Sequence, residues 1–430
     1  MGNPIGYARE RMLASNSSPD QPSAMDLGRY REVRALTEKL VAPLSAEDMQ
    51  LQSMPEASPA KWHLAHTSWY FETFVLAQTA GYQVFHPRYG YLFNSYYEAV
   101  GERHARPKRG LLSRPSVAEV LEYRRHVDAA MERLLAAGPS PLDPVIELGL
   151  HHEQQHQELL LTDLLHAFSQ NPLCPAYATA GEAGTAVAPA HRWLELAEGV
   201  FEVGAPADGF AFDNERPRHK VYLQPCALGS RLVSCGEYLA FIEDGGYRRP
   251  ELWLSEGYEH AQRGNWQAPL YWQRTEQGFM NFGLHGLQPL DAAAPVSSVS
   301  LFEADAYARW AGARLPTEHE WELAARQAAG PANHLEDGKL SAGVAAAASG
   351  VTQLFGDLWE WTSSSYAPYP GYVPLAGALG EYNGKFMCNQ YVLRGGSFAT
   401  PRSHIRASYR NFFPAAARWQ FTGIRLAKSR

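Results

Sequence analysis

The feature that most constrains this chain is the run HHEQQHQE at residues 151–158, which stands directly before the apolar run LLLTDLLHAF. In a helix, His152 and His156 are four residues apart and therefore share one face. A helix that continues into such an apolar run lies next to a core, where an imidazole without a partner is costly. Two imidazoles at this spacing are good ligands for a transition metal ion, so the run predicts a metal site.

The same residues also match the HExxH pattern of zinc hydrolases, with Glu153 in the position of the general base. A hydrolytic zinc site is therefore one alternative, and a surface helix with exposed polar residues is another. Glu158 lies about 200° around the helix from His156, so it is a poor third ligand from the same face.

A metal site needs at least a third ligand, and the segment SPAKWHLAHTSWYFETFVL at residues 58–76 offers His63 and His66. We expect this segment to form a helix with Ser58 as its cap and Pro59 in its first turn. His66 should then point toward the interior of a helical bundle. Alone it would more often be a core histidine, but beside an HxxxH pair it completes a three-nitrogen set with open coordination positions.

Composition limits the classes of function. The chain has 430 residues and is 45% hydrophobic, enough for two or three domains with real cores. Its net charge of −7 and the lack of a basic stripe argue against nucleic acid as a partner. No apolar run is long enough to span a membrane, and no signal peptide is visible. Four cysteines without CxxC spacing do not form a disulfide framework, so we expect a cytoplasmic protein.

The composition and the periodicity of the sequence change along the chain. Residues 1–25 are polar and predict a flexible tail, whereas residues 26–170 carry long helical periodicities. Residues 171–192 are rich in Pro, Ala and Gly and indicate a linker. Residues 193–430 alternate short apolar stretches with Gly, Pro, Asn and Asp, which is typical of a loop-rich α+β domain. Its clear helical segments are GEYLAFIEDG (236–245) and FEADAYARWAG (302–312), and Thr317 with Glu320 predicts a capping box.

Together these motifs resemble the EgtB-type sulfoxide synthases of ergothioneine biosynthesis. The HxxxHxE run and the WHLAH segment are similar to their DinB-like helical domain. The second half is similar to the formylglycine-generating-enzyme fold in the phrases FAFDNERPRHKVYL (210–223), ARLPTEHEWELAAR (313–326), GDLWEWTSSSY (356–366), LRGGSFAT (393–400) and RWQFTGIRLA (418–427). The resemblance covers almost the whole chain after about residue 30. It implies an α+β protein: a DinB-like four-helix bundle, then a C-type-lectin-like α+β domain with little regular secondary structure.

The resemblance also implies a chemistry. His66, His152 and His156 would bind iron(II), Glu158 would orient a ligand imidazole, and Gln155 would contact the substrate. The implied substrates are small molecules: hercynine (the betaine of histidine), dioxygen and a thiol donor. The product carries a new C–S bond at the imidazole C2 and usually a sulfoxide.

The resemblance implies roles for four further residues of the helical half. A tyrosine is expected to donate a proton to the reduced oxygen, and Tyr96 and Tyr97 are the candidates, with ordinary aromatic packing as the alternative. Arg106 and Arg109, spaced RxxR, would hold the carboxylate of the donor. An exposed basic loop is the equal alternative for this pair.

The stretch ASYRNFFPAAARW near the C-terminus is expected to face the iron. Asn411 and Phe412 match positions that hold the trimethylammonium group, which aromatic faces attract. Phe413 stands where relatives that use γ-glutamylcysteine carry an acidic residue, so it predicts a different donor.

Two departures from the family pattern also bear on the donor. Ser298 and Leu301 stand where a histidine and an aromatic residue are expected, and Ser234-Cys235 stand where Thr-Asn is common. Free cysteine fits these features, and so does the selenosugar used by the closely similar selenoneine synthases.

Other functions fit the sequence less well. A zinc-dependent DinB-type thiol transferase or hydrolase would lack the long second domain. A formylglycine-generating enzyme needs a pair of cysteines near its C-terminus, where only Cys388 is present. A non-catalytic binding module would not need three histidines at metal spacing. The sequence carries no signal for the oligomeric state.

Overall fold

The structure, a computed structural model, describes residues 26–179, 186–328 and 332–430. The chain divides into two compact units, Met1–Ala167 with Val373–Lys385, and Phe168–Tyr372 with Phe386–Arg430. The tail expected at residues 1–25 lies outside the described residues, as does part of the expected linker. The excursion at Val373–Lys385 packs with the helical unit although the surrounding sequence belongs to the second unit.

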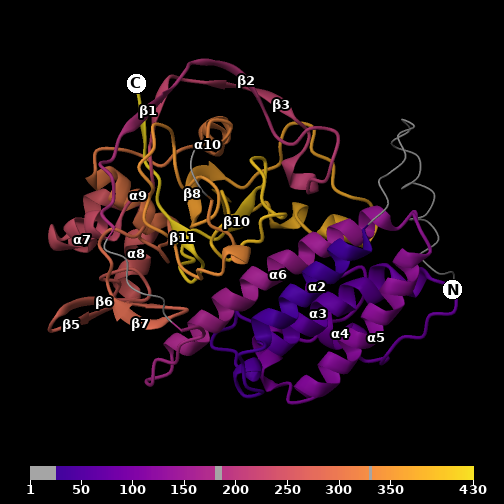
Figure 1. The fold of residues 1–430 in the computed structure, drawn as a ribbon. Coiled ribbons are helices and arrows are strands. Elements are labelled where there is room, and N and C mark those ends of the chain that lie inside the picture. Colours follow the sequence, from indigo (N-terminus) through magenta and orange to yellow (C-terminus); the bar gives the residue numbers. More distant parts are fainter. Residues whose placement is uncertain (1–25, 180–185, 329–331) are drawn as a thin grey trace. The chain divides into compact units, whose positions relative to one another are not determined.

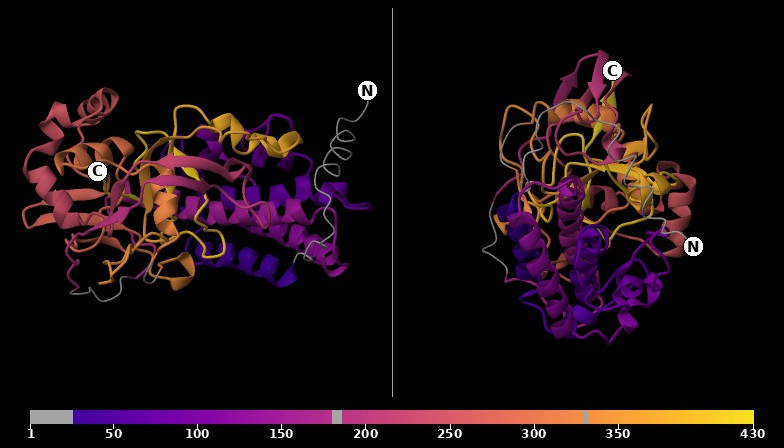
Figure 2. Two further views of the ribbon diagram at one scale, coloured as in Figure 1. Left: turned by 90° about the horizontal axis from the view of Figure 1, so that it is seen from above. Right: turned by 90° about the vertical axis from the view of Figure 1, so that its right-hand side faces the viewer.

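Four long helices dominate the described part of the first unit, and they lie side by side in the views of Figures 1 and 2. They are α2 (Leu27–Val41), α3 (Ala60–Phe74), α5 (Val117–Ala136) and α6 (Asp143–Ser169). The shorter elements are α4 (Tyr89–Phe93) and the 3-10 segments Asp48–Gln50, Leu76–Gln78, Arg106–Leu111 and Gly377–Glu381. The helical bundle predicted from the sequence is confirmed.

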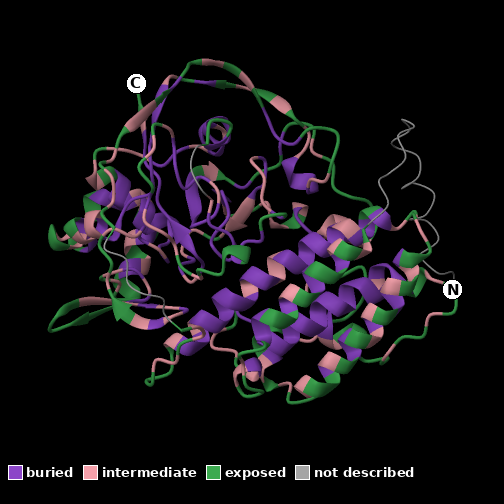
Figure 3. Ribbon diagram, in the orientation of Figure 1, coloured by how far each residue is buried: buried purple, intermediate pink, exposed green. Residues whose placement is uncertain are grey.

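Helix α3 runs through the middle of the bundle, and Figure 3 shows it buried along nearly its whole length. The predicted cap at Ser58 is wrong. The helix begins at Ala60, and Pro59 at the cap position supplies no side-chain hydrogen bond. The hydroxyl of Ser58 instead accepts a hydrogen bond from Arg109, because burial leaves that guanidinium in need of a partner.

Helix α6 approaches α3 closely at Gly149. A Cβ atom there would lie 2.6 Å from the ring of Tyr70 and 2.7 Å from the ring of Phe71. Only glycine leaves room for so close an approach of backbone to aromatic rings. The close packing brings the histidine-bearing turns of both helices within reach of each other.

The second unit is an α+β fold of small sheets joined by long loops, as the sequence predicted. Its strands are β1 (Trp193–Leu196), β2 (Gly199–Val203), β3 (His219–Leu223), β4 (Cys226–Gly229), β5 (Trp272–Thr275), β6 (Gly278–Gly283), β7 (Gly286–Pro289), β8 (Trp359–Ser365), β9 (Tyr391–Arg394), β10 (Asn411–Phe413), β11 (Thr422–Gly423) and β12 (Ala427–Ser429). The sheet orders are β1-β4-β12, β10-β9-β8-β11, β2-β3 and β5-β6-β7. Pairings between these strands are antiparallel, except that β11 runs parallel to β8.

Helices surround these sheets. They are α7 (Cys235–Glu243), α8 (Ser255–Arg263), α9 (Leu301–Trp310) and α10 (Glu318–Ala325), with 3-10 segments at Asp213–Glu215, Gly246–Arg248, Pro250–Leu252 and Leu335–Asp337. A further 3-10 segment, Gly384–Phe386, spans the boundary between the two units in the sequence. The predicted helices correspond to α7 and α9, and the capping box of Thr317 and Glu320 opens α10. The sequence analysis missed α8.

The core of the second unit combines apolar packing with buried ion pairs. Trp321 of α10 is fully buried, and its indole N–H donates to the carboxylate of Glu360 at 2.8 Å. The same carboxylate pairs with Arg425 at 2.7 Å. Among the helices that the structure describes, none has the length and apolar character needed to cross a membrane.

Candidate metal centre

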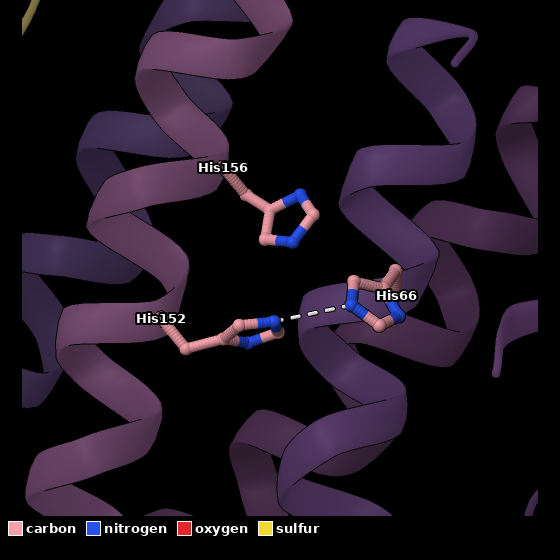
Figure 4. Close-up of side chains that lie close together, drawn as sticks. All are labelled: His66, His152 and His156. Atoms are coloured by element: carbon pink, nitrogen blue, oxygen red, sulfur yellow. Dashed lines mark hydrogen bonds between the residues drawn. The ribbon is translucent and has the colours of Figure 1, made fainter. Parts of the chain in front are cut away.

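Three imidazoles from two helices converge inside the helical unit (Figure 4). His66 comes from α3, and His152 and His156 come from successive turns of α6. One nitrogen from each ring lies within 4.8 Å of the other two. His66 and His152 are almost fully buried, and His156 is half-buried. The three residues that the sequence predicted as metal ligands are therefore close enough to share one ion.

The spacing of the nitrogens fits a metal ion. The Nε2 atoms of His66 and His152 lie 3.1 Å apart. Two imidazole nitrogens bound at 2.0–2.1 Å to one ion, at right angles to each other, would lie about 3 Å apart. Two bare lone pairs facing at this distance repel unless a proton or a cation lies between them. The donor set therefore suits a divalent transition metal, and three nitrogens leave positions open for other ligands.

Burial keeps these imidazoles neutral. It lowers the pKa of His66 well below the ordinary value, and the neighbouring His152 adds to this effect. It also lowers the pKa of His152 to about 3, against the opposing influence of Glu153. The pKa of His156 falls for the same reason, with further contributions from His152 and His66. Near pH 7 all three rings therefore offer lone pairs, which metal binding requires.

The outer nitrogen of each ring meets a different partner. Nδ1 of His66 donates to the backbone carbonyl of Phe93 at 2.6 Å, which leaves its Nε2 free for a metal. Nδ1 of His156 lies 2.8 Å from Nδ1 of His63. Nδ1 of His152 is buried and has no hydrogen-bond partner among the described residues.

Glu153, the base of the HExxH alternative, is held in a separate network. Its carboxylate accepts hydrogen bonds from Arg34 at 2.8 Å, Arg124 at 2.6 Å and Thr37 at 2.6 Å. Burial alone would raise the pKa of Glu153. The charges of Arg124 and Arg34 outweigh burial and lower this pKa to about 2. A carboxylate so firmly paired is a poor general base, which disfavours the hydrolytic interpretation.

Comparisons with known proteins match both halves of the chain. Residues 29–160 match the DinB superfamily, and residues 179–348 and 336–430 match the Sulfatase-modifying factor enzyme 1-like domain. The chain is 34% identical to a hercynine oxygenase of Mycobacterium tuberculosis over 96% of its own length and 99% of that protein. It is 32% identical to a hercynine oxygenase of Mycolicibacterium thermoresistibile, with 94% and 95% covered. This chain belongs to the EgtB-type hercynine oxygenase family.

The second unit on its own is also similar to another group. The formylglycine-generating enzyme of Streptomyces coelicolor is 30% identical over 57% of this chain and 89% of that protein. Membership of the hercynine oxygenase family rests on the two domains together, as the sequence motifs predicted.

Two of the other predicted residues, Gln155 and Glu158, lie on α6 together with His152 and His156. Gln155 projects from α6, and its side-chain oxygen accepts a hydrogen bond from the hydroxyl of Tyr382. The ring of Tyr382 lies 5.8 Å from that of His152. Glu158, the predicted orienting residue, is buried on the same helix. Sequence reasoning missed Tyr382, which is 227 residues from Gln155 and carries no local motif.

The predicted proton donors form an aromatic cluster. Tyr97 is fully buried, and its ring stacks on Tyr96 with centroids 4.7 Å apart. Burial raises the pKa of both phenols, so both keep their protons at neutral pH. A hydrogen bond between the two phenols also contributes, raising the pKa of Tyr97 and lowering that of Tyr96. The ring of Tyr382 lies 6.2 Å from Tyr96, so three tyrosines are grouped here.

The segment that carries Tyr382 is anchored to the helical unit by its neighbours. The carboxylate of Glu381 accepts hydrogen bonds from the backbone N–H groups of Glu98 and Ala99, at 3.0 and 2.9 Å. Lys385 pairs with Glu381 at 2.8 Å and donates to the carbonyl of Tyr96.

The two predicted arginines differ in their surroundings. Arg109 is only 2% exposed, and its guanidinium carbon lies 3.5 Å from the centre of the Trp62 ring. Burial, reinforced by Arg106, lowers the pKa of Arg109 to about 8. No carboxylate among the described residues forms an ion pair with Arg109, which keeps it available for an anionic ligand. Arg106 is exposed and donates to the carbonyl of Glu56.

The predicted trimethylammonium-binding residues lie in β10 of the second unit. Phe412 stacks on Tyr366 with ring centroids 4.0 Å apart, and Phe413 lies 6.2 Å from Trp419. The side chain of Asn411 accepts a hydrogen bond from the backbone N–H of Phe412. Their role in binding stays a prediction.

Proposed function

We propose that this protein is an iron(II)- and O2-dependent enzyme that joins the imidazole C2 of hercynine to the sulfur of a thiol donor such as cysteine. The observation that supports this most is the cluster of three neutral imidazoles, two buried and one half-buried, in a member of the hercynine oxygenase family. Its set of nitrogen ligands suits iron(II), and it leaves open positions for substrates.

The reaction balances with dioxygen as the only oxidant. The C2–H and S–H bonds break and a C–S bond forms. One oxygen atom of O2 enters the sulfoxide, and the other leaves as water with the two hydrogens. The bound iron would supply activation of O2 and of the thiol, which the protein's own side chains cannot provide.

The side chains of the helical unit have roles that fit this reaction. Gln155 would orient the imidazole of hercynine with its amide, and Glu158 would support the ligand geometry. Arg109 would bind the carboxylate of the donor, because its charge is buried and has no ion-pair partner among the described residues. Arg106 would attract the same group from the exposed side.

A tyrosine of the cluster would hold the proton that the reduced oxygen requires. Tyr96 and Tyr97 are the candidates, because burial keeps both phenols protonated and their stacked rings lie side by side. Tyr382 lies next to Tyr96 and donates a hydrogen bond to Gln155. Asn411 and Phe412 remain the proposed ligands of the trimethylammonium group.

The identity of the thiol or selenium donor distinguishes the proposed function from a second candidate function. Phe413 is neutral where an acidic residue would match γ-glutamylcysteine, and this favours cysteine or a selenosugar. With a selenosugar the protein would be a selenoneine synthase that forms a C–Se bond.

One experiment tests both functions. The protein is loaded with iron(II) without oxygen, and O2 is then added with hercynine and either cysteine or a selenosugar. We expect mass spectrometry to show a coupled product with one of the two donors. No product with either donor would contradict the oxygenase proposal, and a zinc-loaded sample in parallel tests the hydrolase or thiol-transferase alternative.

A further inference from the structure

His63 is the one imidazole of the WHLAH segment that is not part of the proposed ligand set. Its side chain is almost fully buried and lies between a proposed ligand and a carboxylate. Nδ1 of His63 is 2.8 Å from Nδ1 of His156, and Nε2 of His63 is 3.2 Å from an oxygen of Asp163. Because His156 and Asp163 are seven residues apart on α6, they share a face, and His63 of α3 fits between them.

The hydrogen-bond chemistry of this chain of groups fixes where the protons are. A carboxylate only accepts, so Nε2 of His63 must carry the hydrogen that faces Asp163. When Nε2 of His156 binds the ion through its lone pair, Nδ1 of His156 carries the ring hydrogen and donates it to Nδ1 of His63. The contact with Asp163 therefore favours the tautomer of His156 that a metal ion needs.

Asp163 is itself held in place. The same oxygen that faces His63 accepts the backbone N–H of Ser58 at 2.8 Å. The hydroxyl of Ser58 accepts from Arg109 at 2.8 Å. The carboxylate is therefore fixed by backbone at the start of α3, so it can in turn fix the ring of His63.

The three proposed ligands thus differ in their outer contacts. His66 donates to a neutral carbonyl, and His152 has no outer partner among the described residues, whereas His156 connects through His63 to a carboxylate. Such outer carboxylates orient a ligand imidazole and raise its basicity.

We propose that Asp163 and His63 form a positioning relay that sets the tautomer and ring orientation of His156 and makes it the most electron-rich of the three nitrogen donors. The inference rests on the metal site of the proposed function. It concerns His63 and Asp163 as positioning residues and assigns neither of them contact with substrate.

The alternative to a relay is simple packing, because the ring of His63 also lies edge-on to Trp62 at 5.8 Å. Two substitutions separate these roles. His63→Asn keeps a polar atom at the position of Nδ1, where it can accept from His156. His63→Leu keeps much of the volume but removes the acceptor. Asp163→Asn keeps the shape of the carboxylate and removes its charge, and the exposed His86→Leu is the matched control.

The measurement is metal affinity by competition with a chromophoric chelator, using iron(II) without oxygen and cobalt(II) as a spectroscopic probe. We expect His63→Leu to weaken binding by about 10–100-fold, the usual effect of losing an outer partner. His63→Asn should recover most of the affinity, and Asp163→Asn should lie between. The visible bands of bound cobalt(II) should shift in His63→Leu and Asp163→Asn but not in His86→Leu.

Identical affinities and cobalt(II) spectra for wild type, His63→Leu and Asp163→Asn would overturn the relay while leaving the metal site intact. If His63→Leu fails to fold, the comparison of Asp163→Asn with wild type decides the question in the same way. Wild-type protein that binds neither iron(II) nor cobalt(II) would instead contradict the proposed function itself.

Discussion

The two units of this protein bury ionisable side chains in different ways. In the second unit, buried carboxylates meet guanidinium groups directly, as in Glu318 with Arg410 at 2.8 Å and Glu360 with Arg425 at 2.7 Å. Among its described residues, the helical unit has a network of this kind around Glu153. Beside it, however, lie two buried imidazoles and one half-buried imidazole whose nitrogens face one another.

This difference separates scaffold from function. A buried ion pair that is fully hydrogen-bonded satisfies its own charges, and a protein needs no ligand to complete it. Burial keeps the facing imidazoles neutral, so each ring carries one N–H and one lone pair, and a divalent cation can bind to the lone pairs. The comparison predicts that changing a paired carboxylate costs stability, whereas changing an imidazole of the triad costs metal binding.

The largest expected loss of stability in the helical unit comes from Glu153→Gln. Removing this charge takes away the fully buried carboxylate that Arg34 and Arg124 share and leaves them only the more exposed Asp128 and Glu38, which should lower the free energy of unfolding by about 3–5 kcal/mol. Urea unfolding monitored by circular dichroism measures the change. The control is Glu132→Gln, which removes an exposed pair with Arg31 and should unfold like wild type. Equal unfolding of the two variants would show that the network is not a scaffold element.

The corresponding change in the second unit is Glu318→Gln. It leaves Arg410 buried without its carboxylate, and the loss should again be about 3–5 kcal/mol. At a temperature where the variant stays folded, its iron(II) stoichiometry should equal that of wild type. Loss of metal from a folded Glu318→Gln protein would show that the buried ion pair of the second unit also supports metal binding.

The sequence predicts structural features that depend on neighbouring residues better than features that depend on residues far apart in the chain. The shared face of His152 and His156 follows from helical spacing, and the position of His66 follows from its place beside the bundle interior. The helical bundle and the loop-rich α+β unit follow from periodicity and composition. The helices and the shared face of His152 and His156 depend on relations within a few residues, which the sequence displays directly, whereas the approach of His66 depends on the packing of α3 against α6.

The parts that sequence reasoning missed depend on distant contacts. The packing of Tyr382 against Gln155 joins residues far apart in the chain, and no local pattern signals it. The hydroxyl of Ser58 binds Arg109 in place of capping α3, because the buried guanidinium is the more demanding partner. The contact of His63 with Asp163 likewise requires two helices to be placed against each other.

Stability of the metal-free protein should depend on pH through His152. The pKa of His152 is about 3 in the folded protein because the ring is buried, whereas an exposed histidine titrates near 6.5. The unfolded chain therefore binds a proton that the folded protein does not. The stabilising contribution is fully present above pH 6.5 and is lost as the pH falls toward 3.

For this histidine alone, the metal-free protein should lose about 2 kcal/mol between pH 6.5 and pH 5. Urea unfolding at several pH values measures the slope. His152→Leu should show a shallower slope, and His86→Leu should keep that of wild type. A slope that His152→Leu leaves unchanged would contradict the account of a buried neutral ring.

We expect Gly149→Ala to cost less stability than loss of either paired carboxylate. The added methyl group would meet the rings of Tyr70 and Phe71, and such overpacking typically costs about 1–3 kcal/mol. Because the helices must move apart, we also expect weaker metal binding, measured by chelator competition. Gly90→Ala, where nothing lies within 4 Å of the new atom, is the control. Unchanged affinity in Gly149→Ala would show that the triad tolerates a shift between α3 and α6.

The central claim is that His66, His152 and His156 hold one redox-active metal ion. Anaerobic titration with iron(II), followed by removal of free metal and elemental analysis, tests it most directly. The account predicts about one iron per wild-type chain and an affinity reduced by more than roughly 100-fold in a folded His66→Ala variant, because a lost ligand costs more than a lost outer partner. A His66→Ala protein that binds iron(II) with the stoichiometry and affinity of wild type would contradict it.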